Sequence, residues 1–304
     1  MAQPIRIGVE TGTWDNFALD CFRNCPTLYD WRIKRGIIKP GARKTAADLG
    51  TGIHLALEHY YKEGMTDKSI AEAINLFAEY YASKQDISDE KRTLGRGLEL
   101  LTKYFTKYRY EPFNVVATEV GGAAELGEYL YTYRMDLIVE WITPKGTYLW
   151  DNKTTSSLGR GIVKPNNQFT GYMAAGIELY ENLLGFMVNY IGVYKSDKQK
   201  DKSTGKMVER DPFVRVPTSR TRREIEDWKV ETINLIHQIE ECQGRDIWPK
   251  FTNHCTAYAS KCAYLDLCQS QDKDIVIPLL EAGVYEKSLW TPYDPGELEE
   301  GGER

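Results

Sequence analysis

The sequence predicts an α/β fold in which a mixed central sheet is flanked by helices. Three stretches place apolar residues at helical spacing: 45–63, 67–84 and 89–108. Three stretches rich in β-branched and aromatic residues then follow as strands: 113–124, 129–142 and 147–155. A further helix, an apolar strand, a charged loop and a last helix complete the pattern: 166–182, 185–195, 195–211 and 219–243. Helices on both sides of a run of strands indicate a sheet that helices cover.

The hairpin in the middle of this pattern gathers three charged side chains on one face. A Pro-Lys-Gly turn signal separates its two strands. If Ile142 pairs with Thr147, then Asp136 lies opposite Lys153, and Asp151 is one pleat away. Side chains alternate between the faces of a strand, so these three converge. Two carboxylates and a lysine on a sheet can hold a divalent metal, whereas the alternative is a solvated strand face with a surface ion pair.

Two residues that precede the hairpin in the sequence, His54 and Glu119, could also belong to this site. His54 lies at the border of the apolar stripe of the helix at 45–63, where it could reach a metal or could be a packed core histidine. Gly50 and Gly52 weaken this helix unless it approaches its neighbours closely. Glu119 lies among apolar residues in a strand, and a charge there needs a partner or a metal.

A polar pair follows the hairpin. Asn166 or Asn167 can cap the next helix, which carries Gln168 and Tyr172 at positions i and i+4 and hence on one face. The packing of an amphipathic helix would explain Tyr172, but it explains Gln168 less well.

The whole ordered set resembles the RecB-type branch of the PD-(D/E)xK nuclease superfamily. Its members are His54, Glu119, Asp136, Asp151, Lys153 and the motif Gln168 to Tyr172. The resemblance spans residues 20–270 and depends on the order and spacing of the set. It implies a restriction-endonuclease-like core with a metal-dependent nuclease site.

The resemblance also implies a role for each residue. The ligands of Mg²⁺ or Mn²⁺ would be His54, Glu119, Asp136, Asp151 and the carbonyl of Asn152. Lys153 would orient the attacking water or stabilise the transition state. Gln168 and Tyr172 would position the substrate strand.

The cysteines give a second line of evidence. Cys25 stands before a proline near the start of the chain, and Cys255, Cys262 and Cys268 crowd together near its end. This pattern resembles the iron-sulfur subset of the same branch, which includes CRISPR-associated and AddB-like exonucleases. In that subset four thiolates hold a 4Fe-4S cluster, which joins the N- and C-terminal segments as a clasp.

Other interpretations of these cysteines remain open. Cys255 fits least, because six residues separate it from Cys262 where the family more often has two, and Cys21 competes with Cys25 as the first ligand. The same thiolates could hold zinc, or they could be free buried thiols. Disulfides would require an oxidising compartment. The opening MAQPIRIGVE does not resemble an export signal, so we expect a cytoplasmic location, in a bacterium or in the host of a phage.

Composition sets wider limits. The chain has 304 residues, of which 42% are hydrophobic, so it can bury a full core, and it lacks an apolar run long enough to span a membrane. Its net charge is −5, so an enzyme that binds DNA would have to concentrate its basic residues locally. The candidate clusters are Arg32, Lys34, Arg35, Lys39, Arg43 and Lys44; Arg160 and Lys164; and Arg220, Arg222 and Arg223.

We expect one nuclease domain over residues 1–270 and an acidic tail at 271–304. The domain would consist of a helical part at 45–110, a catalytic core at 113–195, a loop or hairpin insertion at 196–210, and a C-terminal helix and cysteine segment at 219–270. The expected activity is that of a DNA exonuclease on single-stranded DNA or free ends, in end processing, recombination or repair. A structure-selective endonuclease with the same site and a non-catalytic DNA-binding module are the alternatives.

Overall fold

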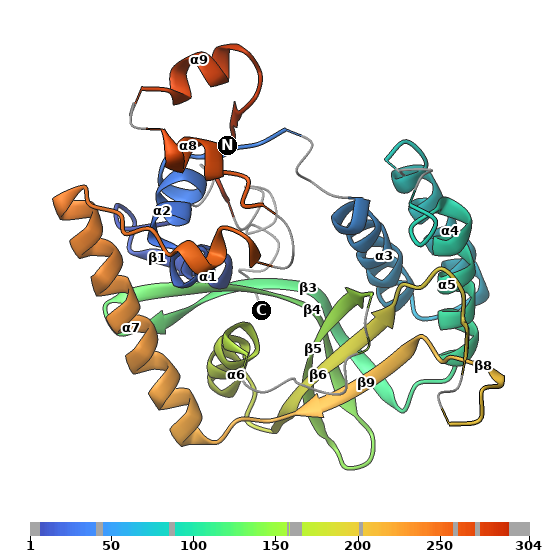
Figure 1. Cartoon of the computed structure of the whole chain (residues 1–304). Coiled ribbons are helices and arrows are strands. Elements are labelled where there is room, and N and C mark those ends of the chain that lie inside the picture. Colours follow the sequence, from blue (N-terminus) through green and yellow to red (C-terminus); the bar gives the residue numbers. More distant parts are fainter. Residues whose placement is uncertain are drawn as a thin grey trace. The chain divides into compact units, whose positions relative to one another are not determined.

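The computed structural model describes residues 7–40, 45–84, 89–156, 158, 166–200, 203–257, 261–270 and 274–291. The chain divides into two compact units, and Figure 1 shows their elements. The terminal unit consists of Met1–Ala42, Gly121–Tyr133 and Thr221–Arg304, and the central unit of Arg43–Val120 and Arg134–Arg220. The single nuclease domain expected from the sequence stays a prediction. No helix in the described part of the chain is long and apolar enough to cross a membrane.

The central unit contains a mixed sheet. Strands β4 (Tyr129–Trp141) and β5 (Gly146–Thr155) form an antiparallel hairpin. Strand β6 (Leu183–Gly192) runs parallel to β5, because helix α6 (Asn167–Leu179) connects the two. Strand β9 (Phe213–Thr218) then pairs antiparallel with β6. The prediction of a mixed central sheet flanked by helices is therefore confirmed.

The register of the hairpin differs from the expected one by two residues. The structure pairs Glu140, not Ile142, with Thr147, and the ladder closes at Trp141 and Gly146. A Cβ on Gly146 would lie 2.9 Å from the carbonyl oxygen of Asn182, so the close approach of the segment before β6 requires glycine at the start of β5. A shift of two leaves every side chain on its predicted face, since the period of a strand is two. It brings Asp136 level with Asp151 instead of Lys153.

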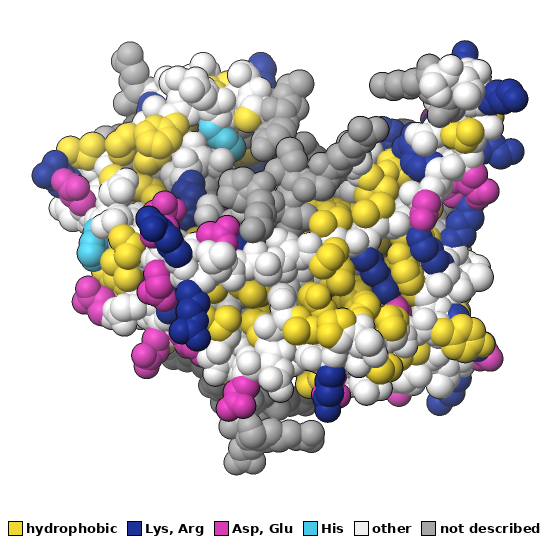
Figure 2. All heavy atoms as spheres, turned by 90° about the horizontal axis from the view of Figure 1, so that it is seen from below, with side chains coloured by type: hydrophobic (Ala, Val, Ile, Leu, Met, Phe, Trp, Pro, Cys, Tyr) yellow, Lys and Arg dark blue, Asp and Glu magenta, His cyan; other side chains and the backbone are white. Residues whose placement is uncertain are grey.

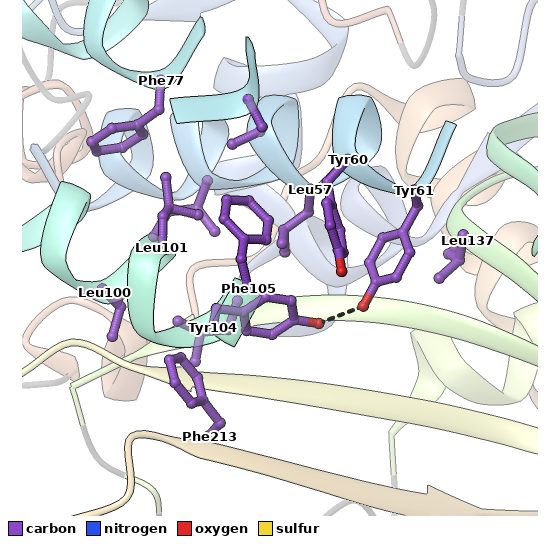
Figure 3. Close-up of a cluster of buried hydrophobic side chains, with 14 of the residues drawn as sticks. Leu57, Tyr60, Tyr61, Phe77, Leu100, Leu101, Tyr104, Phe105, Leu137 and Phe213 are labelled. Carbon is purple, nitrogen blue, oxygen red and sulfur yellow. Dashed lines mark hydrogen bonds between the residues drawn. The ribbon is translucent and has the colours of Figure 1, made fainter. Parts of the chain in front are cut away.

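Three helices of the central unit pack together and against buried apolar residues of the sheet, which include Leu137, Val139 and Trp150. The three helices are α3 (Thr45–Lys62), α4 (Asp67–Ala82) and α5 (Leu94–Lys107). Helix α5 begins later than the expected residue 89, because the Thr93 side chain caps it by accepting from the Arg96 amide. Figure 3 shows the cluster of buried side chains that joins these helices to Leu137 of β4 and Phe213 of β9.

Close approach explains the glycines of α3. A Cβ on Gly52 would lie 3.0 Å from the Phe77 ring, and one on Gly50 would lie 3.2 Å from Thr154 Oγ1 on strand β5. Both glycines thus let the helix approach its neighbours, which offsets their low helix propensity. The expected hairpin insertion is also present, because β7 (Lys198–Lys200) and β8 (Met207–Glu209) pair antiparallel and are exposed.

The terminal unit is mainly helical. Strand β1 (Thr13–Asp15) pairs parallel with the first part of β4, and β3 (Phe113–Leu126) pairs with β4 as well. The helices that follow β1 are α1 (Asn16–Asn24), α2 (Pro26–Tyr29) and the π-helix η1 (Asp30–Lys34). The long helix α7 (Arg222–Arg245) packs against α1.

The C-terminal segment is folded where a tail was expected. The elements η2 (Thr252–His254) and α8 (Leu265–Gln269) belong to the expected cysteine segment, whereas α9 (Val276–Glu281) and β10 (Glu286–Lys287) lie within the expected tail. Strand β10 pairs with β2 (Ile37–Ile38), and Tyr285 packs with Trp31 and Tyr264. The expectation of a tail from residue 271 was therefore wrong for 274–291, because short apolar stretches there bury themselves against the N-terminal segment.

Asp15 joins the two ends of the terminal unit. Its carboxylate caps α1 by accepting from the Ala18 amide at 2.7 Å, and it accepts from Trp290 Nε1 at 2.6 Å. The residue is only 7% exposed. Burial raises the pKa of Asp15 to about 6 despite these hydrogen bonds.

This burial predicts an unusual dependence of stability on pH. An acid whose pKa is raised by folding binds more protons in the folded state, so its contribution to stability falls as pH rises from about 4 to about 6. The substitution Asp15→Asn removes one hydrogen bond and also this titration. We expect the variant to be less stable than wild type at pH 4, with the gap narrowing by up to about 3 kcal/mol at pH 7. Denaturant unfolding at both pH values measures this, and parallel pH profiles for the two proteins would contradict it.

Candidate active site

A pocket of about 510 Å³ in the central unit contains the site predicted from the sequence. Seven expected side chains line it: His54, Glu119, Asp136, Asp151, Lys153, Gln168 and Tyr172. Strand β3 supplies the glutamate, the β4–β5 hairpin the two aspartates and the lysine, and helices α3 and α6 the remaining three. The elements that were expected to converge therefore do so within one unit.

Asp136 is the centre of this site. The ladder between β4 and β5 ends at the pair Leu137 and Trp150. The next β5 amide that points towards β4 is that of Asn152, and it therefore has no backbone acceptor in the ladder. The Asp136 side chain provides an acceptor in place of the backbone, because its Oδ2 accepts a hydrogen bond from the Asn152 amide at 2.6 Å. His54 Nδ1 lies 3.3 Å from the same oxygen. One carboxylate thus joins both strands of the hairpin to helix α3.

Glu119 completes a compact group. One oxygen of Glu119, one oxygen of Asp136 and one ring nitrogen of His54 all lie within 4.8 Å of one another. The backbone of Glu119 is left-handed, with a φ of 49° inside a strand. Such a conformation costs about 1–3 kcal/mol and persists where the surroundings require it, often at functional sites.

Arg134 is a site residue that the sequence analysis missed. Its Nε donates to Glu119 Oε2 at 2.6 Å, and its side chain lines the same pocket. The sequence did indicate this position, because Arg134 precedes Asp136 by two residues on one strand and therefore shares its face. The guanidinium thus orients the Glu119 carboxylate through Oε2.

Asp151 and Lys153 form an ion pair at the wall of the pocket. Lys153 Nζ donates to Asp151 Oδ1 at 3.0 Å and lies 2.9 Å from Oδ2. Asp151 is 2% exposed, and its Oδ2 accepts no hydrogen bond from any described residue. The Lys153 ammonium at 2.9 Å is the cation that compensates this buried oxygen.

The pKa values show how crowded the negative charge is. Burial raises the pKa of Asp151 to about 6 and that of Glu119 to about 7, and the nearby Asp136 carboxylate contributes to both. Burial alone would lower the pKa of His54, but Asp136 outweighs it and raises that pKa to about 9. The two aspartates likewise raise the pKa of Lys153 although burial opposes them. Cations are thus strongly favoured in this pocket.

The donor set fits a hard divalent metal. Ligand atoms that hold an ion at about 2.1 Å lie at most about 4.2 Å apart, so the group of three needs only small side-chain movements to close around one. Carboxylate oxygens suit Mg²⁺ and Mn²⁺, and the imidazole favours the softer Mn²⁺. His54 has to lose its proton to become a ligand, so metal binding and proton release are coupled.

Asn152 contributes through its backbone. The amide and carbonyl of one strand residue point to the same side, so the amide that donates to Asp136 implies that the Asn152 carbonyl faces Asp136 as well. The side chain points the other way, into the core, where Trp150 Nε1 donates to its Oδ1 at 3.1 Å.

Gln168 and Tyr172 lie together on α6 as expected. The Asn166 side chain caps this helix by accepting from the Phe169 amide at 3.0 Å, and Gln168 Nε2 donates to the Tyr172 hydroxyl at 2.9 Å. Both side chains line the pocket, where an amide and a hydroxyl can bind phosphate oxygens.

The cysteines line a second cavity, in the terminal unit. This cavity has a volume of about 370 Å³, and its walls include Cys25, Cys255, Cys262 and Cys268. Cys21 is buried on α1 and does not line it. Among the described residues, no three of these sulfurs lie within 4.8 Å of one another.

The basic clusters are largely paired within their own units. Arg35 contacts Asp30, Lys34 contacts Asp246, and Arg220 donates to Thr170. Figure 2 shows Lys and Arg interspersed with Asp and Glu on one face of the molecule. Four members of the candidate clusters lie outside the described residues: Arg43, Lys44, Arg160 and Lys164.

Comparison with known proteins identifies the family. The sequence profile of the PD-(D/E)XK nuclease superfamily matches residues 17–269. This chain therefore belongs to the PD-(D/E)XK nuclease superfamily and is a nuclease by family. No curated protein matches significantly.

Two solved structures are similar to this chain. One is described as "Putative exonuclease" from Eubacterium rectale; it is 13% identical, the match covers 94% of this chain and 92% of that one, and the TM-score is 0.46. The other is SSO0001, which is 14% identical over 73% of this chain and 85% of that one, with a TM-score of 0.30.

Proposed function

We propose that this protein is a Mg²⁺- or Mn²⁺-dependent DNA exonuclease of the RecB-type branch. The observation that carries the proposal is the group of His54, Glu119 and Asp136 donor atoms within 4.8 Å, beside the Asp151–Lys153 pair in one pocket. This arrangement combines metal ligands with a fixed positive charge, which is what hydrolysis of a phosphodiester needs.

The metal, when bound, would lower the pKa of a water ligand and offset charge on the scissile phosphate. Residues of the protein itself would stabilise the developing charge and orient the substrate. Lys153 stays protonated because Asp151 and Asp136 raise its pKa, so its ammonium can stabilise the negative charge that develops on the phosphate. Gln168 and Tyr172 offer polar atoms from α6 that can orient the substrate strand.

We infer that the substrate is DNA that is single-stranded or has free ends, and that the activity belongs to end processing, recombination or repair. The resemblance to the RecB-type branch supports this. Incubation of the protein with linear and with circular single-stranded DNA, in the presence of Mn²⁺ or a chelator, tests it. An exonuclease degrades only the linear form, whereas an endonuclease with the same site would cut both.

Removal of the lysine tests the active site. We expect Lys153→Ala to lower the cleavage rate at least about 100-fold, because it removes the ammonium that is paired with Asp151 beside the acidic group. Asp151→Ala should have a similar effect. Lys145→Ala is the matched control, since Lys145 lies at the turn of the same hairpin with its side chain 77% exposed. Near-normal cleavage by folded Lys153→Ala protein would contradict the assignment, and thermal unfolding checks that the variants fold.

We also propose that the four cysteines of the second cavity hold a 4Fe-4S cluster. Four cysteine side chains that line one 370 Å³ cavity support this. Cys25 and Cys255 are 230 residues apart, so their joint ligation would close a long loop of the chain. Direct contacts already join the same segments, since Thr27 Oγ1 donates to the Trp248 carbonyl at 2.9 Å. The cluster would therefore add to an existing junction.

The colour of the protein tests this proposal. Anaerobically purified wild type should be brown and contain about four irons per chain, because thiolate-ligated iron absorbs broadly in the visible range and zinc does not. Cys262→Ser should bleach it. The matched control is Cys242→Ser on α7, which does not line the cavity and should leave the colour unchanged. Iron-free wild-type protein from an anaerobic preparation would contradict the cluster and leave the nuclease site untouched.

A further inference from the structure

A chain of buried polar side chains begins directly behind the proposed active site. Asn152 lies between Asp151 and Lys153 in sequence, and its side chain enters the core. Asn152 Oδ1 accepts two hydrogen bonds, from Trp150 Nε1 at 3.1 Å and from Asn189 Nδ2 at 2.7 Å. Asn189 pairs with Asn152 in the parallel β5–β6 ladder, so the two side chains lie on the same face.

The chain continues to a buried ion pair. Asn189 Nδ2 also donates to the Tyr104 hydroxyl at 2.9 Å, and that hydroxyl lies 2.8 Å from the hydroxyl of Tyr61, as Figure 3 shows. Arg215 then donates to Tyr104 at 3.2 Å and forms two hydrogen bonds to Glu111, at 2.6 and 2.8 Å. The Glu111 side chain is 1% exposed. All of these residues belong to the central unit.

This network contributes less to the stability of the fold than apolar residues of the same volume would. A buried ion pair contributes little net free energy compared with apolar residues of the same volume. Asn189 is fully buried, and its own Oδ1 accepts no hydrogen bond from any described residue. An unsatisfied buried carbonyl costs about 1–3 kcal/mol, and a leucine at this position would avoid that cost. The asparagine therefore calls for a role other than packing.

The orientation of the Asn152 peptide supplies such a role. Beyond Leu137 and Trp150, the β4–β5 ladder no longer holds β5 on the β4 side. There the Asn152 amide donates to Asp136, and its carbonyl faces the same acidic group. On its other edge β5 is held by the ladder with β6, and the Asn152 side chain adds a further contact with the core, since Asn189 donates to it at 2.7 Å.

We propose that Asn189 is a positioning residue for the metal site. By holding the Asn152 side chain, it fixes the peptide whose amide orders Asp136 and whose carbonyl completes the ligand set. The Tyr104 hydroxyl, which accepts from Asn189 Nδ2, in turn fixes Asn189. The inference rests on the proposed function, because it assumes that a divalent cation binds in the acidic pocket.

The test compares two substitutions within the same network. Asn189→Leu removes the donor to Asn152, whereas the control Tyr61→Phe removes a hydroxyl that contacts neither asparagine. Calorimetric titration with Mn²⁺ in the absence of DNA gives the metal affinity. Cleavage of linear DNA over a range of Mn²⁺ concentrations gives the half-saturating concentration and the maximal rate, and thermal unfolding gives the stability of each variant.

We expect Asn189→Leu to weaken Mn²⁺ binding about 10-fold or more, the usual effect of losing a partner behind a metal ligand, and to raise the half-saturating Mn²⁺ concentration by the same factor. Tyr61→Phe should leave both within about twofold while lowering thermal stability. If Asn189→Leu fails to fold, Tyr104→Phe loosens the second contact of Asn189 and should weaken Mn²⁺ binding more than Tyr61→Phe does.

Two outcomes separate the inference from the proposed function. Equal Mn²⁺ affinity in wild type and folded Asn189→Leu, or equal effects of Tyr104→Phe and Tyr61→Phe where that pair is used, would overturn the positioning role alone. Wild-type protein that neither binds Mn²⁺ nor cleaves DNA would overturn the proposed function.

Discussion

The hydrogen bond from the Asn152 amide to the Asp136 carboxylate is the interaction on which the site depends. It forms where the ladder between β4 and β5 stops, so a side chain replaces a backbone partner at the point where the chemistry is expected. The same carboxylate oxygen faces His54 on α3. Gly50 lets that helix approach β5, so the packing of α3 and the geometry of the acidic group are coupled. A single buried carboxylate therefore links strand pairing, helix packing and ligand placement.

The electrostatics of the pocket follow from that geometry. One buried and two half-buried carboxylates lie close together, and Arg134, His54 and Lys153 form ion pairs with Glu119, Asp136 and Asp151, respectively. The raised pKa values of Glu119 and Asp151 reflect this crowding and their burial. A divalent cation would relieve the repulsion and would displace the proton on His54, so metal affinity should depend on pH. The left-handed backbone of Glu119 indicates that the fold accepts strain to complete this group.

Much of the site could be predicted because its parts depend on short-range periodicity. The faces of Asp136, Asp151 and Lys153 follow from the two-residue period of a strand, which is why an error of two in the register did not separate them. The positions of His54 and of the Gln168–Tyr172 pair follow from helical spacing. The network behind Asn152 could not be predicted, since it joins residues as far apart as Tyr61 and Arg215. The folded segment at 274–291 was missed for the same reason, because its strand pairs with β2 some 250 residues earlier.

The central claim is that the acidic group around Asp136 binds a divalent metal, and titration of the DNA-free protein with Mn²⁺ tests it most directly. Wild type should bind Mn²⁺ and release protons on binding. Asp136→Asn keeps the size of the side chain but lacks the charge, and it should lose at least about tenfold in affinity while remaining folded. Equal Mn²⁺ affinity in the two proteins, or no binding by wild type, would contradict the account.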